Sequence, residues 1–119
     1  MYIDPYKSTQ TSHEAFKLLQ MFEQLRELDH EMPAQLLSCF LYVASHNPCH
    51  KVALEEALEL SVASGSRNID RLCEVNRLKK PGLGLVQKEE DPSNRRRLII
   101  SLTLKGKELI KDLKTAVYN

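Results

Sequence analysis

The sequence contains no tryptophan, few aromatic residues and only four glycines, and its three cysteines form no Cys-x-x-Cys pair. An odd number of cysteines without paired spacing argues against a disulfide framework and against a zinc site. No Gly-rich phosphate loop, Ser/His/Asp grouping or pair of carboxylates stands out. We therefore expect a protein that is not an enzyme and has no catalytic, cofactor-binding or metal-binding residues.

Long hydrophobic runs are also missing. No stretch approaches the ~20 apolar residues that a membrane span requires. Residues 1–5 have neither the basic start nor the apolar core of a signal peptide. The 119 residues, of which 42% are hydrophobic, fit one domain that covers 1–119, and the default expectation is a cytoplasmic protein.

The net charge of +1 conceals an uneven distribution. Residues 13–60 carry three basic and eight acidic side chains, a net charge of −5, whereas residues 64–97 carry nine and five, a net charge of +4. A basic region on a nearly neutral protein suits local contact with phosphate. A dipolar surface without any partner is the plainer alternative.

Apolar residues recur at helical spacing in five segments, and residues suited to helix ends flank them. The predicted helices cover about 13–30, 33–47, 51–60, 65–78 and 104–117. Ser64 is expected to cap the fourth helix, with residues 61–63 as a short link before it. Val52 and Ala57 are expected to face inward from the third helix.

Between the last two helices the sequence predicts a β-hairpin. Strand-like runs at 85–89 and 98–102 flank the turn residues Asp91-Pro92-Ser93-Asn94. Helices followed by a basic hairpin and a last helix are typical of a winged helix-turn-helix, whose wing would cover 84–102. A short extra strand near 48–51 would complete a small sheet. The predicted fold class is mostly α with a small β-hairpin.

The fourth predicted helix has the two faces that a helix in the major groove of DNA needs. Ile69, Leu72 and Cys73 form an apolar side. The polar side carries the predicted DNA contacts Ser64, Ser66, Arg67, Asn68 and Arg71. Arginine can bond guanine, asparagine can bond adenine, and the serines near the helix start suit a phosphate. The alternative is a solvated face on which Asp70 or Glu74 pairs with the arginines.

The predicted wing carries Arg95, Arg96 and Arg97 at the start of its second strand. Because consecutive strand residues alternate faces, the three are not expected to reach one target. One is expected in the narrow minor groove, whose negative potential attracts arginine, and another on a phosphate or on Asp91. Further phosphate contacts are predicted for Lys79, Lys80 and Lys88. The alternative is a charged hairpin that only aids solubility.

The wing resembles that of the MarR family of bacterial winged-helix transcription regulators. The matching residues are Gly84-Leu85-Val86, Asp91-Pro92, Asn94-Arg95-Arg96 and Leu102-Thr103-Leu104-Lys105-Gly106. The resemblance implies that Arg96 contacts DNA and that the protein forms a homodimer through helices 13–30 and 104–117. Two features depart from the family pattern: Asn94 stands where an aspartate is usual, and the stretch 62–82 is a few residues longer.

The cysteines and histidines suggest only minor roles. Cys39 and Cys73 lie on apolar helix faces and are predicted in the core. Cys49, in a predicted loop, is the more exposed candidate for redox sensing. The run from His46 to His50 is the only cluster that resembles a metal site, and it has no second half.

The function that the sequence predicts is a transcription regulator that binds double-stranded DNA, with helix 65–78 in the major groove and the wing at phosphate or in the minor groove. No membrane partner is expected, and no small-molecule effector can be named. The alternative is a winged-helix module that binds another protein and not DNA.

Overall fold

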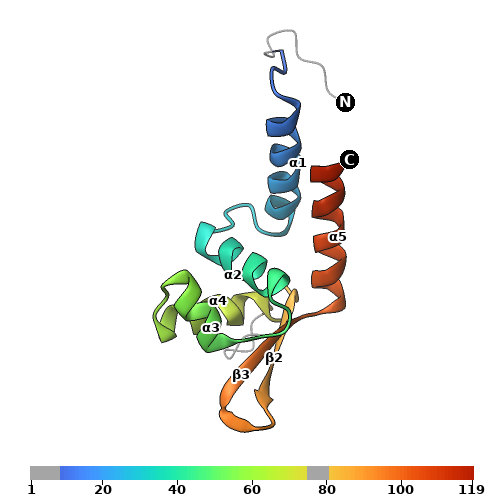
Figure 1. Ribbon diagram of the computed structural model, residues 1–119. Helices are drawn as coiled ribbons and strands as arrows, with labels where there is room; N and C mark the ends of the chain where they lie inside the picture. The colour runs from blue at the N-terminus through green and yellow to red at the C-terminus, as the bar shows by residue number, and fades with distance from the viewer. Residues whose placement is uncertain (1–8, 75–80) are drawn as a thin grey trace.

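The computed structural model describes residues 9–74 and 81–119. These residues form a mostly helical winged helix-turn-helix, as predicted (Figure 1). Its elements are α1 (His13–Leu28), α2 (Ala34–Ser45), β1 (Cys49–His50), α3 (Lys51–Leu58), α4 (Val62–Leu72), β2 (Val86–Asp91), β3 (Asn94–Leu102) and α5 (Leu104–Tyr118). No helix in the described ranges has the length and apolar character needed to cross a membrane.

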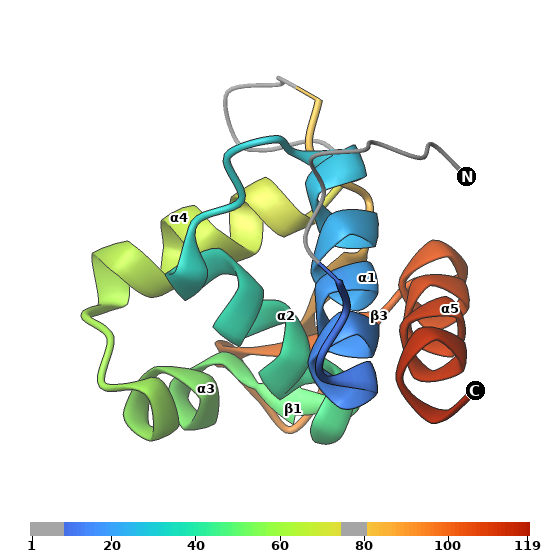
Figure 2. The ribbon, with the colours of Figure 1, turned by 90° about the horizontal axis from the view of Figure 1, so that it is seen from above.

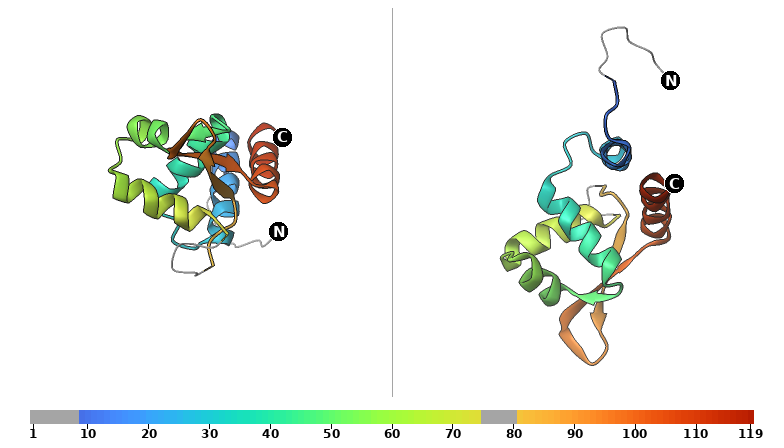
Figure 3. Two further views of the ribbon diagram at one scale, coloured as in Figure 1. Left: turned by 90° about the horizontal axis from the view of Figure 1, so that it is seen from below. Right: turned by 45° about the horizontal axis from the view of Figure 1, so that its top comes forward.

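The helices α1 and α5 lie side by side at one end of the molecule, and the hairpin of β2 and β3 projects from the other end (Figure 1). The view from above also places α1 beside α5 (Figure 2). Between these ends lies α2, which contacts α3, α4, β3 and α5. The turned views show α3 and α4 together on the side of the hairpin (Figure 3). The pair of helices α1 and α5 and the hairpin therefore form separate surfaces at opposite ends of the molecule.

The three strands form one antiparallel sheet in the order β1-β3-β2. The predicted extra strand near 48–51 is β1, where Cys49 pairs with Ile100 and His50 with Ile99. Alternation along β3 buries Ile100 and Leu102 against the helices, as the period of two predicts. Its first four residues, 94–97, are exposed. The hairpin is therefore anchored at its base, and residues 94–97 near its tip are exposed.

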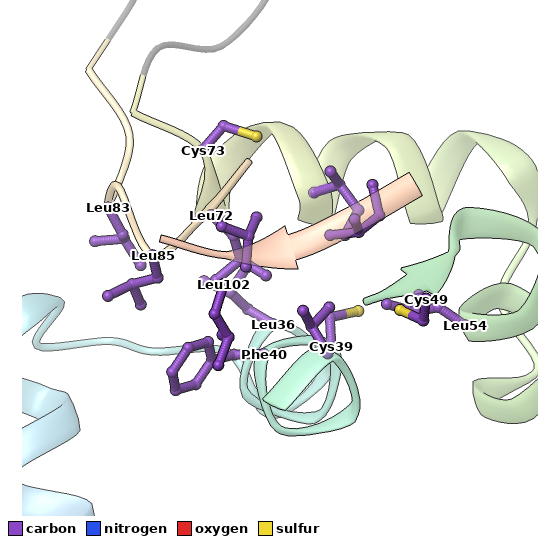
Figure 4. Packing of buried hydrophobic residues seen from close by; sticks show 14 of the residues in the cluster. Leu36, Cys39, Phe40, Cys49, Leu54, Leu72, Cys73, Leu83, Leu85 and Leu102 are labelled. Atoms are coloured by element: carbon purple, nitrogen blue, oxygen red, sulfur yellow. The ribbon is translucent and has the colours of Figure 1, made fainter. Parts of the chain in front are cut away.

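The core is built around α2. Leu36, Cys39, Phe40 and Val43 recur at helical spacing and are almost completely buried. They pack with residues from all the surrounding elements, including Cys49, Leu54, Leu72, Leu83, Leu85 and Leu102 (Figure 4). Full burial of one such side chain is worth about 1.5–3 kcal/mol, so this cluster holds the hairpin base and the helices together.

The fourth helix begins earlier than predicted. Its N-cap is Ser61 and not Ser64, because the Ser61 hydroxyl accepts the Ser64 backbone N–H at 3.0 Å. The turn before it is set by Glu59, which adopts the left-handed conformation with φ of 55°. Val62 and Ala63 are therefore helical residues and not a link, and the helix-turn-helix consists of α3, a three-residue turn and α4.

The same helix also ends earlier, at Leu72, so the predicted end at residue 78 is wrong. Cys73 is extended, and the carbonyl groups of residues 71–74 accept hydrogen bonds from the backbone of residues 82–85 at 2.7–3.2 Å. A continuing helix would need those carbonyls for itself. The remainder of the predicted helix, 75–78, lies outside the described residues.

The third helix faces the core differently from the prediction. Leu54 is fully buried, but Val52 is 49% exposed and Ala57 is exposed as well. The inward position next to Leu54 belongs to Glu55, whose carboxylate is paired with Lys51. The ion pair takes a charged residue into the interface with α4, where periodicity alone predicts apolar side chains.

The junction of wing and last helix explains the Leu-Thr-x-x-Gly pattern. The Thr103 hydroxyl caps α5 by accepting the Gly106 N–H at 3.0 Å, and it donates to the Gly84 carbonyl at 2.6 Å. A side chain on Gly106 would overlap the Leu85 carbonyl oxygen. The absent Cβ therefore lets α5 start directly against the base of β2.

Candidate nucleic-acid interface

The helix α4 is held in place from its inner side. Ile69 and Leu72 are buried, as predicted, and the Glu55 carboxyl group of α3 lies against Gly65. The small residue permits this close approach, and the Lys51 ammonium neutralises the carboxylate beside it. The outer side of α4 is left for the polar residues.

Those polar residues are partly engaged within the chain. Arg67 is exposed and its guanidinium donates to the Ser64 hydroxyl at 3.2 Å. The Asn68 amide donates at 2.8 Å to the Gln35 side chain and to the Ser64 carbonyl. Arg71 pairs with an acidic group outside the helix, at 3.3 Å from Asp29. Of the three predicted base contacts, Arg67 is therefore the most accessible.

A small cleft separates α4 from the wing. Its volume is about 130 Å³, and it is lined by Ser66 and Asp70 of α4, Lys51 of α3, and Lys88 and Leu98 of the hairpin, together with Ile69. Ser66 is half-buried at its rim. Two of the predicted contacts, Ser66 and Lys88, thus meet at one place between α4 and the wing.

Lys88, which the sequence predicts as a phosphate contact, is paired within the chain. Its ammonium donates to the Asp70 carboxylate at 2.6 Å, and the Asp70 side chain is only 12% exposed. This pair connects β2 with α4. This geometry favours a structural role for Lys88, in which it links the wing to α4, over a role as an unpaired cation that binds phosphate. Lys79 and Lys80, the other predicted phosphate contacts, lie outside the described residues.

The wing arginines occupy a break in the sheet register. Glu90 pairs with Leu98 and the next residue, Asp91, pairs with Asn94. Residues 95–97 therefore have no opposite residues on β2. All three arginines are exposed, and no ion pair to them occurs in the described part of the chain. Because a bulge interrupts the alternation of side chains along a strand, the three arginines are not required to point to opposite faces of the sheet.

Asn94 supports this bulge through the backbone. Its side-chain oxygen accepts the Arg96 backbone N–H at 3.1 Å. The interaction orders the chain at Arg96 without charge. The position where the MarR family has an aspartate is thus structurally occupied by a neutral acceptor.

The turn at the wing tip is organised by Asp91. Its carboxylate accepts the backbone N–H and the hydroxyl of Ser93 at 2.9 and 2.8 Å, and it accepts from His50 Nε2 at 2.8 Å. The hydrogen bond from His50, followed by those from Ser93, lowers the pKa of Asp91 to about 2. Asp91 is consequently not a partner of the arginines, and it ties the wing tip to β1.

The cluster from His46 to His50 is divided among separate contacts. His46 stacks on Tyr42 with ring centroids 4.2 Å apart, and His50 bonds Asp91. Cys49 lies in β1 and is buried, so its predicted exposure in a loop is wrong. No group of three His, Cys, Asp or Glu side chains is placed to hold a metal ion within residues 9–74 and 81–119.

The remaining cysteines are buried as predicted, and burial makes all three thiols poor nucleophiles. Desolvation raises the pKa of Cys39 to about 11 and also raises the pKa of Cys49 and Cys73. The described structure contains no exposed thiol.

Comparison with solved structures identifies the architecture, whereas no protein-family model and no curated protein matches the sequence significantly. The Staphylococcus aureus MepR–DNA complex superposes with a TM-score of 0.66 at 17% identity, over 86% of this chain and 77% of that one. For MarR the TM-score is 0.60 at 21% identity, over 88% and 75%. Reduced AbfR bound to DNA gives 0.61 at 21%, over 87% and 71%. The chain has the MarR-type winged-helix fold.

In the MarR-type fold of this chain, α3 and α4 form the helix-turn-helix, and the hairpin of β2 and β3 is the wing. At these identities the likeness establishes the fold alone. The sequence did not identify Val62 and Ala63 as part of the surface of α4, because residues 61–63 are predicted to be a short link before the helix. It also missed the pairs Lys88–Asp70 and His50–Asp91, whose partners are 18 and 41 residues apart.

Proposed function

We propose that this protein is a transcription regulator that binds double-stranded DNA, with α4 in the major groove and the wing on the adjacent backbone or minor groove. The observation that carries the proposal is the exposed, bulged triplet Arg95–Arg97 on the hairpin whose first strand, β2, contacts α4. Exposed arginines without acidic partners suit phosphate and the negative potential of a narrow minor groove.

Solved structures with a similar fold support the proposal that this protein binds DNA. Among the matching structures, those of MepR, AbfR and a MarR mutant are described as bound to DNA. In this proposal, Arg67 and the wing arginines make the principal contacts with DNA, and Ser66 lies near the DNA backbone. Ser64, Asn68 and Arg71 would exchange present intramolecular hydrogen bonds for contacts with DNA.

Binding to random-sequence duplex DNA at several salt concentrations tests the proposal. The triple variant Arg95→Gln/Arg96→Gln/Arg97→Gln should bind more weakly. Its plot of log K against log salt should also be flatter, because each lost phosphate contact removes about 0.9 from the slope. The matched control, Lys105→Gln/Lys107→Gln/Lys111→Gln, removes the same charge from exposed positions of α5.

The control variant should keep the wild-type slope. Equal loss in the two triple variants would mean that binding follows net charge and not the wing. Absence of binding to any duplex at low salt would overturn the DNA-binding proposal and favour a winged-helix module that binds protein.

We further infer a homodimer formed through α1 and α5. Leu18, Leu19 and Phe22 of α1 are about half exposed, and Tyr118 of α5 is 80% exposed. A groove of about 640 Å³ between α1, α2 and α5 is lined mainly by apolar side chains, among them Leu18 and Tyr118. Contiguous apolar surface of this kind is typical of an interface.

Light scattering at micromolar concentration tests the dimer. The wild type should have twice the monomer mass, and Leu19→Gln/Phe22→Gln should be monomeric. The control Leu104→Gln changes an equally apolar, 73% exposed residue at the other end of α5. A monomeric wild type, or equal effects of the variants, would contradict this interface.

A further inference from the structure

The first two residues of α4 form an exposed apolar tip, defined here as Val62 and Ala63. Val62 is 71% exposed, and Ala63 is exposed as well. Arg67 lies one turn beyond Ala63 on the outer side of the same helix, whereas Val62 lies on the side of Ile69. The apolar tip is therefore the N-terminal end of the helix that the proposed function places in the major groove.

Packing does not account for the apolar character of this tip. Ile69, two turns further along the side of Val62, is buried, whereas Val62 is exposed. The core therefore does not reach the N-terminal end of α4. Capping is performed by Ser61, and the contact of Lys51 reaches only the Val62 carbonyl, at 3.4 Å. Val62 is also β-branched, which gives it no advantage over a polar residue at a helix start.

The edges of the base pairs in the major groove offer one group suited to such side chains. Thymine alone presents a methyl group there, and apolar side chains recognise it by contact. Residues at the N-terminal end of a recognition helix are those that reach base edges. The cationic residues nearby, on α4 and on the wing, provide attraction to the phosphates on either side.

We propose that Val62 and Ala63 recognise the 5-methyl group of thymine and so select for thymine within the bound DNA site. This inference rests on the proposed function, because it requires α4 in the major groove. It assigns base specificity to the apolar tip, whereas the wing arginines contribute affinity that is independent of sequence.

The test uses duplexes selected from a random library by the full-length protein. Thymines in the protected region are replaced one at a time by deoxyuridine, which removes only the methyl group. At one position or more, wild-type binding should weaken about fourfold, the value for one buried methyl-sized group. The variant Val62→Ser/Ala63→Ser should bind both duplexes equally, and the control Leu104→Ser should keep the wild-type ratio.

The possible results separate this inference from the proposal beneath it. If selected duplexes bind but every deoxyuridine replacement is neutral, or if the variant keeps the wild-type ratio, the thymine assignment is wrong and DNA binding stands. If no duplex is selected or bound, the proposed function fails and the thymine assignment fails with it.

Discussion

The ammonium group of Lys88 lies 2.6 Å from the carboxylate of Asp70, and this pair joins the first strand of the wing to α4. Asp70 is largely buried and Lys88 is partly exposed. The pair stands between the two surfaces that the proposed function brings to one DNA duplex. We infer that the pair sets the relative position of these two surfaces.

Replacing Lys88 should therefore affect folding more than phosphate binding. We expect Lys88→Met to lower the free energy of unfolding by about 1–2 kcal/mol, a value between those for exposed and buried ion pairs. Urea denaturation measures this loss. The salt dependence of DNA binding should keep its slope, and a slope reduced by about one would instead identify Lys88 as a phosphate contact.

Arg96 should show the opposite behaviour. Its side chain is exposed and has no described partner, so Arg96→Ala should leave the free energy of unfolding within about 0.5 kcal/mol of the wild type. Affinity for duplex DNA should fall, and the slope of log K against log salt should decrease by about 0.9. Anisotropy titrations at four salt concentrations, with denaturation in parallel, check both expectations. A large loss of stability would assign Arg96 a structural role.

Because Asp91 holds the turn at the wing tip, we expect the stability of the protein to depend on pH in the acidic range. Hydrogen bonds from His50 and Ser93 lower the pKa of Asp91 from 3.8 to about 2. Because the pKa in the folded protein is the lower one, the stabilisation is complete above about pH 4 and is lost as the pH falls toward 2. The variant Asp91→Asn should be less stable than the wild type at pH 7, and the difference should narrow between pH 4 and pH 2. A difference that is constant across this range would contradict the assignment.

Gly106 should resist a substitution that usually favours helices. Glycine to alanine in a helix ordinarily stabilises by about 0.5–1 kcal/mol. Here the new methyl group would overlap the Leu85 carbonyl oxygen, so we expect Gly106→Ala to destabilise by about 1–3 kcal/mol. Thermal unfolding measures the change. The control Lys107→Ala, at the next and exposed position of α5, should change stability by less than about 0.5 kcal/mol.

Local chemistry made the wing predictable from sequence. Asp91 accepts the backbone N–H of the residue two positions on, which is the turn interaction that aspartate before proline favours. Thr103 caps α5, as its position before a helical pattern indicates. Both interactions join residues within three positions of each other, so their signals are contained in short stretches of sequence.

Backbone geometry at one turn, and contacts between distant residues, set the features that the sequence did not predict. Ser61 and Ser64 both suit an N-cap, and the choice depends on the left-handed turn at Glu59. The end of α4 depends on residues 82–85, which take the carbonyl groups at its terminus. The environment of Lys88 depends on Asp70, a partner that no local pattern indicates. Among the predicted DNA contacts, accessibility was therefore the least predictable property.

The backbone hydrogen bonds between residues 71–74 and 82–85 have a consequence for how this chain tolerates change. The Gly82 N–H lies 2.7 Å from the Glu74 carbonyl, so the chain returns to the place that it left. Because the cost of closing a loop grows only slowly with its length, we expect a change in the number of residues between these two points to leave the flanking elements in register. A stretch longer than usual between α4 and the wing is then compatible with a constant distance between the two.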